Sequence, residues 1–221
     1  MITVMYYVSR IELGKTLAGR LMELKGQEAV VIALKESALT ACIGLASEIN
    51  AWVYPLLTQR IYVPGDPRIM GLIDETGTFT WNPSLEKMQR DEIEMESHGV
   101  LEDAKRAGFT ELNRTLGQYG SFNRDALNGR VLLLTGDVIE DRIEIATALQ
   151  YLKSIRYATL YGLGGNVDAE AADYFHIETD KDVLLDVMTH MFPVEHYFDR
   201  QDSYSPEESR QLAVNISQYW T

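Results

Sequence analysis

The fold of this chain is decided by the stretch Arg130-Val131-Leu132-Leu133-Leu134 and by a second apolar run, Ala29-Val30-Val31-Ile32-Ala33-Leu34. Unbroken runs that contain β-branched residues are typical of strands covered on both faces. A helical pattern follows each run, through Ile49 in one case and over residues 143–152 in the other. Strands that alternate with helices predict an α/β fold, with a mostly parallel Rossmann-like sheet and helices on both faces.

Local signals predict the remaining elements. A capping box at Ser9 begins a first helix, which Gly26 is expected to end. Asn82-Pro83 is expected to begin an exposed helix that ends near residue 107 and breaks at Gly99. The other predictions are an edge strand at 51–57, a loop at 60–66, a hairpin formed by 70–73 and 78–81, loop with some helix at 108–128, strands at 157–161 and 175–177, a short helix from Asp168, and helices over 180–190 and from Ser205.

Composition limits the class of protein. The chain has 221 residues, of which 46% are hydrophobic and 24% charged, and this balance fits a single domain over residues 1–221 with a sizeable core. The formal net charge of -13 argues against a general nucleic-acid binder and against a binder of anionic membranes, because both partners are dense in negative charge.

The single cysteine and the N-terminal residues bear on the compartment. Cys42 cannot form an internal disulfide or a cysteine zinc site, which fits a reducing compartment. Residues 1–10 lack the pattern of a signal peptide, and no apolar stretch approaches the roughly 20 residues that span a bilayer. We therefore expect a cytoplasmic protein.

In open α/β sheets, ligands bind beyond the carboxyl ends of the strands. This rule places residues 35–37, 135–141 and 162–166 around one crevice. The third segment contains Gly164 and is interpreted as a turn that leaves a strand and enters a helix, where a ligand could approach the backbone closely. A flexible turn without a ligand is the alternative.

Three blocks of sequence, in order along the chain, resemble a bacterial branch of the type I phosphoribosyltransferases. They are Arg10-Ile11-Glu12-Leu13-Gly14, the Pro-Gly-x-Pro block from Arg60 to Gly77, and Pro193-Val194-Glu195-His196-Tyr197-Phe198-Asp199. The resemblance implies the phosphoribosyltransferase fold with a small hairpin or hood subdomain. It also implies transfer of ribosyl phosphate from phosphoribosyl pyrophosphate, with Mg²⁺, to a nucleobase-like acceptor, and it makes a homodimer a reasonable expectation.

The phosphate loop departs from the family pattern. The family has two adjacent acidic residues after a buried strand and then a small, glycine-rich turn that wraps the 5′-phosphate. Thr135-Gly136 stands at the acidic pair and residues 139–143 stand at the turn. Glu140 and Asp141 would then repel a phosphate, each by about 1 to 4 kcal/mol at 4 Å. Alternatively, Asp137 and Glu140 cap the next helix, or Asp137, Glu140 and Asp141 form a cation site.

The pyrophosphate loop departs as well. Lys35-Glu36-Ser37-Ala38 stands where this branch has an Arg-Gly-Gly turn. Lys35 could still meet an anion as a point charge, but Glu36 opposes that. The alternative is a plain turn with Ser37 as the N-cap of the next helix. Arg60 matches the family's basic position and could face the crevice, or it could be a solvated loop residue.

Both loops depart in the direction that disfavours phosphate. The sequence therefore predicts a phosphoribosyltransferase-fold protein with degenerate loops, without transfer activity and without a required cofactor, in a binding or regulatory role. A small-molecule ligand and a homodimer are the expected partners. The alternative is an active phosphoribosyltransferase that needs Mg²⁺ and uses Asp137 and Lys35 in makeshift roles.

Overall fold

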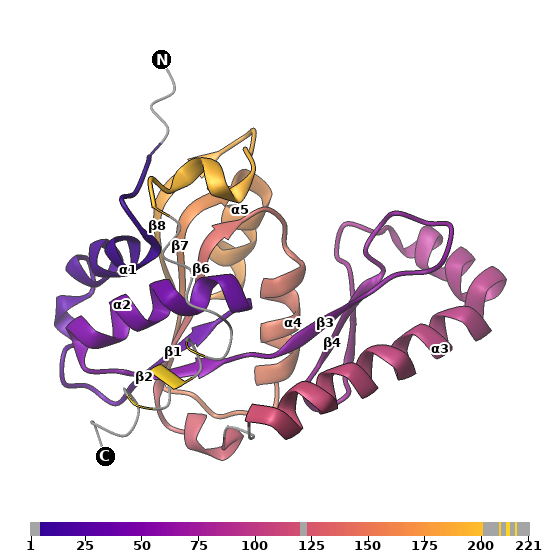
Figure 1. Cartoon of the computed structure of the whole chain (residues 1–221), viewed down its shortest axis with the longest axis horizontal. Helices are drawn as coiled ribbons and strands as arrows, with labels where there is room; N and C mark the ends of the chain where they lie inside the picture. The colour runs from indigo at the N-terminus through magenta and orange to yellow at the C-terminus, as the bar shows by residue number, and fades with distance from the viewer. Residues whose placement is uncertain (1–4, 120–122, 201–207, 209–210, 213–214, 216–221) are drawn as a thin grey trace. The chain divides into compact units, whose positions relative to one another are not determined.

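The computed structural model describes residues 5–119, 123–200, 208, 211–212 and 215 (Figure 1). Its contacts divide the chain into two compact units. Unit 1 comprises Met1–Pro55, Phe122–Asp141 and Ile155–Thr221, and unit 2 comprises Leu56–Ser121 and Arg142–Ser154. The single domain expected over residues 1–221 stays a prediction.

A parallel sheet forms the centre of unit 1 (Figure 1). Its five strands lie in the order β2-β1-β6-β7-β8. Their bounds are Ala29–Ala33 for β1, Trp52–Pro55 for β2, Val131–Ile139 for β6, Thr159–Asp168 for β7 and Lys181–Met188 for β8. The predicted α/β class is thus confirmed, and both deciding runs are buried strands at the centre of the sheet.

The strand order reverses between β1 and β6. From β1 the chain continues to its neighbour β2 on one side and later returns to β6 on the other side. The carboxyl ends of β1 and β6 lie together, since Ala33 pairs with Thr135. A reversal of this kind opens a place for ligands between the two strand ends.

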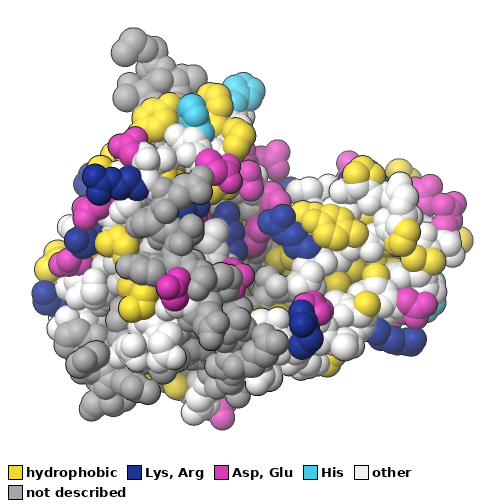
Figure 2. Space-filling view, viewed as in Figure 1, with side chains coloured by type: hydrophobic (Ala, Val, Ile, Leu, Met, Phe, Trp, Pro, Cys, Tyr) yellow, Lys and Arg dark blue, Asp and Glu magenta, His cyan; other side chains and the backbone are white. Residues whose placement is uncertain are grey.

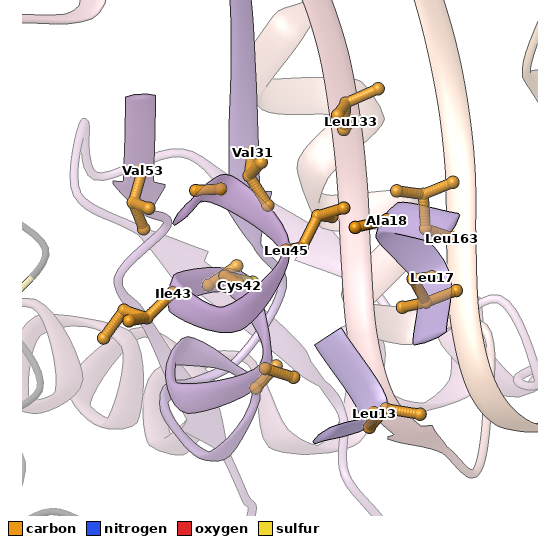
Figure 3. Close-up of a cluster of buried hydrophobic side chains, with 14 of the residues drawn as sticks. Leu13, Leu17, Ala18, Val31, Cys42, Ile43, Leu45, Val53, Leu133 and Leu163 are labelled. Carbon is orange, nitrogen blue, oxygen red and sulfur yellow. The ribbon is translucent and has the colours of Figure 1, made fainter. Parts of the chain in front are cut away.

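Helices cover both faces of this sheet. On one face, α1 (Arg10–Gly19) and α2 (Leu39–Ile49) direct Leu17 and Leu45 toward Leu133 and Leu163 of the strands (Figure 3). On the other face lies α5 (Ala169–Glu178), because a Cβ added at Gly162 of β7 would stand 2.4 Å from the Phe175 ring. The described part of unit 1 also contains four 3₁₀ helices, η1 (Met22–Leu24), η2 (Glu36–Ala38), η3 (Arg124–Leu127) and η4 (Val194–Tyr197).

Unit 2 contains a small antiparallel sheet, which confirms the predicted hairpin subdomain. Its strands are β3 (Thr58–Ile61), β4 (Gly71–Asp74) and β5 (Phe79–Trp81), in that order, and its helices are α3 (Lys87–Tyr119) and α4 (Ile143–Leu152). Asp74 is fully buried and fixes the β4–β5 turn, because its Oδ1 accepts hydrogen bonds from the N–H groups of Thr76 (2.8 Å) and Thr78 (3.1 Å). Ile61 and Ile73 of the sheet pack with Leu101 and Leu112 of α3.

Several predicted bounds were wrong. The α1 helix ends at Gly19 instead of Gly26, and β3 occupies part of the expected loop. Helix α3 begins at Lys87, because the Asn82 side chain accepts from the Ser84 N–H and forms a turn there. It kinks at Ser97 instead of Gly99 and continues through the expected loop to Tyr119.

Residues 175–177 and 180–190 were also assigned wrongly. The first lie in α5, whose N-cap Asp168 accepts from the Glu170 N–H, so α5 begins where a helix was expected but runs on to Glu178. The second form mostly β8, because β7 lies alongside and pairs with it from Tyr161 to Asp168. Residues 205–207 of the last predicted helix lie outside the described residues. No helix in the described part of the chain is long and apolar enough to cross a membrane.

Two glycines allow α1 and α2 to approach at backbone distance. A Cβ at Gly14 would stand 2.0 Å from the Ala41 carbonyl oxygen, and a Cβ at Gly44 would stand 2.5 Å from the Ile11 carbonyl oxygen. Backbone atoms cannot turn aside as a flexible side chain can. The helices would therefore have to separate if either glycine carried a side chain.

We expect Gly14→Ala to lower the free energy of unfolding by about 1 to 3 kcal/mol, the usual cost of overpacking a core. Urea denaturation followed by circular dichroism measures this change. Gly19→Ala in the same helix is the matched control, because nothing lies within 4 Å of its added Cβ. The control should be neutral or up to about 1 kcal/mol more stable, and equal effects of the two substitutions would contradict the close approach.

Candidate functional site

A buried carboxylate lies where the strand order reverses. Asp137 of β6 is fully buried. Its Oδ2 lies 2.9 Å from Nε of Arg10, and its Oδ1 lies 3.6 Å from Nζ of Lys35. The Ser37 hydroxyl also donates to Oδ1, at 3.3 Å. These four residues, Arg10, Lys35, Ser37 and Asp137, are called the Asp137 cluster below.

The members of the cluster come from three local elements. Ser9 caps α1 and places Arg10 at its first turn, where the guanidinium also stacks over the Phe198 ring at 4.4 Å. Lys35 lies two residues after β1, at the N-cap of η2, and donates a hydrogen bond to the Val138 carbonyl. Ser37 lies in η2, the short turn before α2. The cluster thus links the start of α1 and the turn after β1 to the end of β6.

The surrounding charges keep Asp137 ionised. Burial by itself would raise its pKa, but the Lys35 ammonium, the hydrogen bond and charge of Arg10, and a backbone hydrogen bond from Val138 together hold the pKa below its ordinary value. The Cys42 thiol lies nearby, and burial first and the Asp137 charge second raise its pKa well above the ordinary value. The thiol is therefore protonated at neutral pH, and Asp137 supplies the negative charge that faces Arg10 and Lys35.

Three of the residues predicted to line a crevice lie together, and their role in binding a ligand stays a prediction. The structure brings Lys35, Ser37 and Asp137 together, as the rule for strand ends predicted. It leaves Glu36 exposed on η2. Arg10 was missed, although a signal existed: a cation in the first turn of a helix opposes the helix dipole, so it needs a carboxylate nearby.

The capping predictions were wrong. Strand β6 continues to Ile139, so Asp137 lies inside a strand and cannot cap a helix. Helix α4 begins at Ile143 after Arg142, with no side-chain hydrogen bond at its N-cap. The N-cap of α2 is Ala38, because the Ser37 hydroxyl is directed to Asp137 instead.

The possible cation site is not formed. Asp137 faces the interior, whereas Glu140 lies beyond the strand and is exposed, and Asp141 is half-buried. Within the described residues, no group of three histidine, cysteine or acidic side chains is placed to hold a metal ion. The Asp137 carboxylate has cations as its neighbours, which is the opposite of what a metal site requires.

Gly164 does not lie at a strand-to-helix turn, and this prediction was also wrong. It lies inside β7 opposite Gly136 of β6, and an added Cβ would stand 2.3 Å from the Val167 side chain. A Cβ at Gly165 would stand 2.6 Å from Leu13 of α1. The close backbone approach suggested for a ligand is therefore taken by Val167 at Gly164, and by the Asp137 carbonyl and Leu13 at Gly165.

Arg60 belongs to unit 2. Its Nη2 lies 3.1 Å from Oε1 of Glu144, and it is about half exposed. Burial lowers the pKa of Arg60, but the charges and hydrogen bonds of Glu144 and Tyr62 together outweigh it, so the pKa is raised above its ordinary value. Within unit 2 this pair joins β3 to α4.

Exposed aromatic side chains gather near His196. Tyr6 and Phe192 are exposed, and the Tyr6 hydroxyl lies 3.1 Å from Nε2 of His196. Figure 2 shows hydrophobic and histidine side chains together at the top of the face in view. The expected homodimer stays a prediction.

No family model matches the sequence, and no curated protein matches it. Among solved structures, TT1426 from Thermus thermophilus is similar, with a TM-score of 0.71 and 16% identity over 96% of this chain and 100% of that chain. At that identity the likeness shows a common fold alone.

Two phosphoribosyltransferases are more distant matches. Hypoxanthine-guanine phosphoribosyl transferase of L. donovani aligns at a TM-score of 0.44 and 12% identity, over 86% of this chain and 88% of that chain. A mutant hypoxanthine phosphoribosyltransferase from Trypanosoma cruzi aligns at 0.45 and 11%, over 90% and 85%. TM-scores below 0.5 carry no structural argument.

We expect Asp137→Asn to lower the free energy of unfolding at pH 7 by about 3 to 5 kcal/mol, because it leaves the buried Arg10 and the partly buried Lys35 without their carboxylate. The pKa of Asp137 is lowered in the folded state, so its contribution is complete above the unfolded value of about 3.9 and is lost as pH falls through the lower folded value. Urea unfolding at a series of pH values measures both effects.

The matched control for this prediction is Asp103→Asn. Asp103 pairs with Arg106 at 3.3 Å, but both side chains are nearly four-fifths exposed. The control should change stability by less than about 1 kcal/mol. A difference between wild type and Asp137→Asn that persists unchanged at pH 2 would show that the ionised carboxylate is not the stabilising group.

Proposed function

We propose that this chain is a phosphoribosyltransferase-like protein that does not transfer phosphoribosyl groups and serves a binding or regulatory role. The resemblance of three sequence blocks and the parallel sheet with a small antiparallel sheet support the scaffold. One observation carries the functional part of the proposal. The segment that aligns with the family's acidic pair and the start of its phosphate turn is a buried strand whose carboxylate faces Arg10 and Lys35.

The backbone of that segment is engaged in the sheet. In β6, Gly136 pairs with Gly164 and Ile139 pairs with Val167 of β7. On its other side, the Thr135 carbonyl accepts from the Leu34 N–H at 3.1 Å. A turn that wraps a phosphate needs backbone N–H groups that point at the ligand. Residues 135–139 are instead extended and paired with β7, although β1 accompanies them only as far as Thr135, so they do not form such a turn.

The cations at the strand ends are also engaged. The Arg10 guanidinium holds Asp137, and the Lys35 ammonium contacts both Asp137 and the Val138 carbonyl. A pyrophosphate group would have to compete with these partners for Lys35. Separating a buried ion pair leaves an unpaired charge and costs several kcal/mol. Occupation by the protein's own groups, and not repulsion by the exposed Glu140, therefore disfavours the anion.

Titration calorimetry with phosphoribosyl pyrophosphate at millimolar Mg²⁺ tests this proposal. We expect no saturable heat, and no pyrophosphate release with a panel of purine and pyrimidine bases. An active phosphoribosyltransferase measured in the same buffers is the positive control. Tight binding that requires Mg²⁺, or pyrophosphate release with any base, would identify an active enzyme. In that case Lys35→Met should abolish the signal.

A further inference from the structure

A hollow of about 270 Å³ lies at the opposite end of the same sheet. Its walls are formed by residues 26–29, Asn50, Trp52 and Arg130. Trp52 is the first residue of β2, and Arg130 directly precedes β6. The hollow therefore lies at the amino ends of β1, β2 and β6, whereas the Asp137 cluster lies at the carboxyl ends.

Backbone hydrogen bonds hold the walls of this hollow in place. Gly26 and Asn50 both have positive φ angles, of 80° and 59°, which turn the chain sharply before β1 and after α2. The Gly26 N–H donates to the Ile49 carbonyl at 3.2 Å, and the Val131 N–H donates to the Glu28 carbonyl at 3.1 Å. The two turns and the start of β6 are thus joined directly, so the hollow is already formed without a ligand.

Arg130 stacks on Trp52 at one wall. The central carbon of its guanidinium lies 3.5 Å from the centroid of the Trp52 ring, and both residues are half-buried. Stacking covers one face of the planar guanidinium and leaves the N–H groups along its edge. In the part of the chain that the structure describes, the Arg130 side chain forms no hydrogen bond or ion pair. This differs from Arg10, whose guanidinium is held by a buried carboxylate.

We propose that this hollow binds a small oxyanion, a carboxylate or a phosphate, on the edge of the Arg130 guanidinium. A planar guanidinium fixed by stacking binds such groups through two parallel hydrogen bonds and loses little side-chain freedom in doing so. Glu28 also lines the hollow and adds a negative charge, so the charges favour a singly charged carboxylate over a doubly charged phosphate. The proposal is independent of the Asp137 cluster and of any phosphoribosyl chemistry.

Titrations with sodium acetate and with sodium phosphate at constant ionic strength test the proposal. The probe signal is the indole N–H resonance of Trp52, assigned by comparison with Trp52→Phe. We expect the resonance to shift and saturate, with acetate bound more tightly than phosphate. Tighter binding of phosphate would still support the oxyanion site and would identify phosphate as the ligand group.

Variants of Arg130 separate a specific site from general charge effects. Arg130→Gln should weaken binding by about tenfold or more, which corresponds to the loss of one hydrogen bond to a charged group. Arg130→Lys keeps the charge but loses the paired hydrogen bonds, so it should also bind more weakly than wild type. Circular dichroism of both variants checks that they fold.

The matched control is Arg156→Gln. Arg156 is exposed and does not line the hollow, although its backbone bonds to Gly129 next to Arg130. Its substitution should leave both affinities unchanged. A shift that does not saturate, or equal affinities in wild type and Arg130→Gln, would overturn the proposal. An equal loss in Arg156→Gln would also overturn it, because general charge attraction would then explain the binding.

Discussion

The buried ion pair between Asp137 and Arg10 is the constraint on which the centre of unit 1 depends. A carboxylate with no exposure to water is costly unless cations and hydrogen bonds surround it. Arg10 supplies them from α1, and Lys35 and Ser37 supply them from the turn after β1. The start of α1, the turn after β1 and the end of β6 must therefore come together for Asp137 to remain ionised.

The same interaction explains how the strand ends are used. With its charge satisfied from α1 and from Lys35, β6 continues as a strand to Ile139 beside β7. Leu13 of α1 packs close to the backbone of Gly165, on the neighbouring strand. The protein's own side chains Arg10, Lys35 and Asp137 thus bind one another in the region that an α/β sheet commonly offers to a ligand. The reversal of strand order between β1 and β6 therefore holds an ion pair of the protein itself.

Signals contained within one segment predicted the fold well. The runs at 29–34 and 130–134 predicted β1 and β6, because a strand that is buried on both faces consists of an almost unbroken run of apolar residues. The hairpin of β4 and β5 followed from Asp74 and Gly77, whose turn chemistry is also local.

Predictions failed where a distant partner decides the structure. Residues 137–140 have the spacing of a capping box, but β7 lies beside them and extends the strand. Residues 181–188 form a strand for the same reason, since β7 offers them a pairing edge. The partner of Arg10 is 127 residues away in sequence, so no local pattern could identify it. The rule for strand ends thus brought Lys35, Ser37 and Asp137 together correctly, but the ion pair of Asp137 with Arg10 is a long-range contact that the sequence does not display.

The two ends of the sheet differ in the interaction that holds an arginine side chain in place. Arg10 is buried and directs its guanidinium edge at a carboxylate, so its charge is neutralised inside the protein. Arg130 is half-buried and rests its face on Trp52, a contact that fixes the side chain but leaves its edge directed at no carboxylate of the described chain. An arginine can bind a ligand only through an edge that the protein has not already used. Of these two residues, only Arg130 meets that condition, and for this reason the amino ends of the strands are better suited to bind an anion than their carboxyl ends.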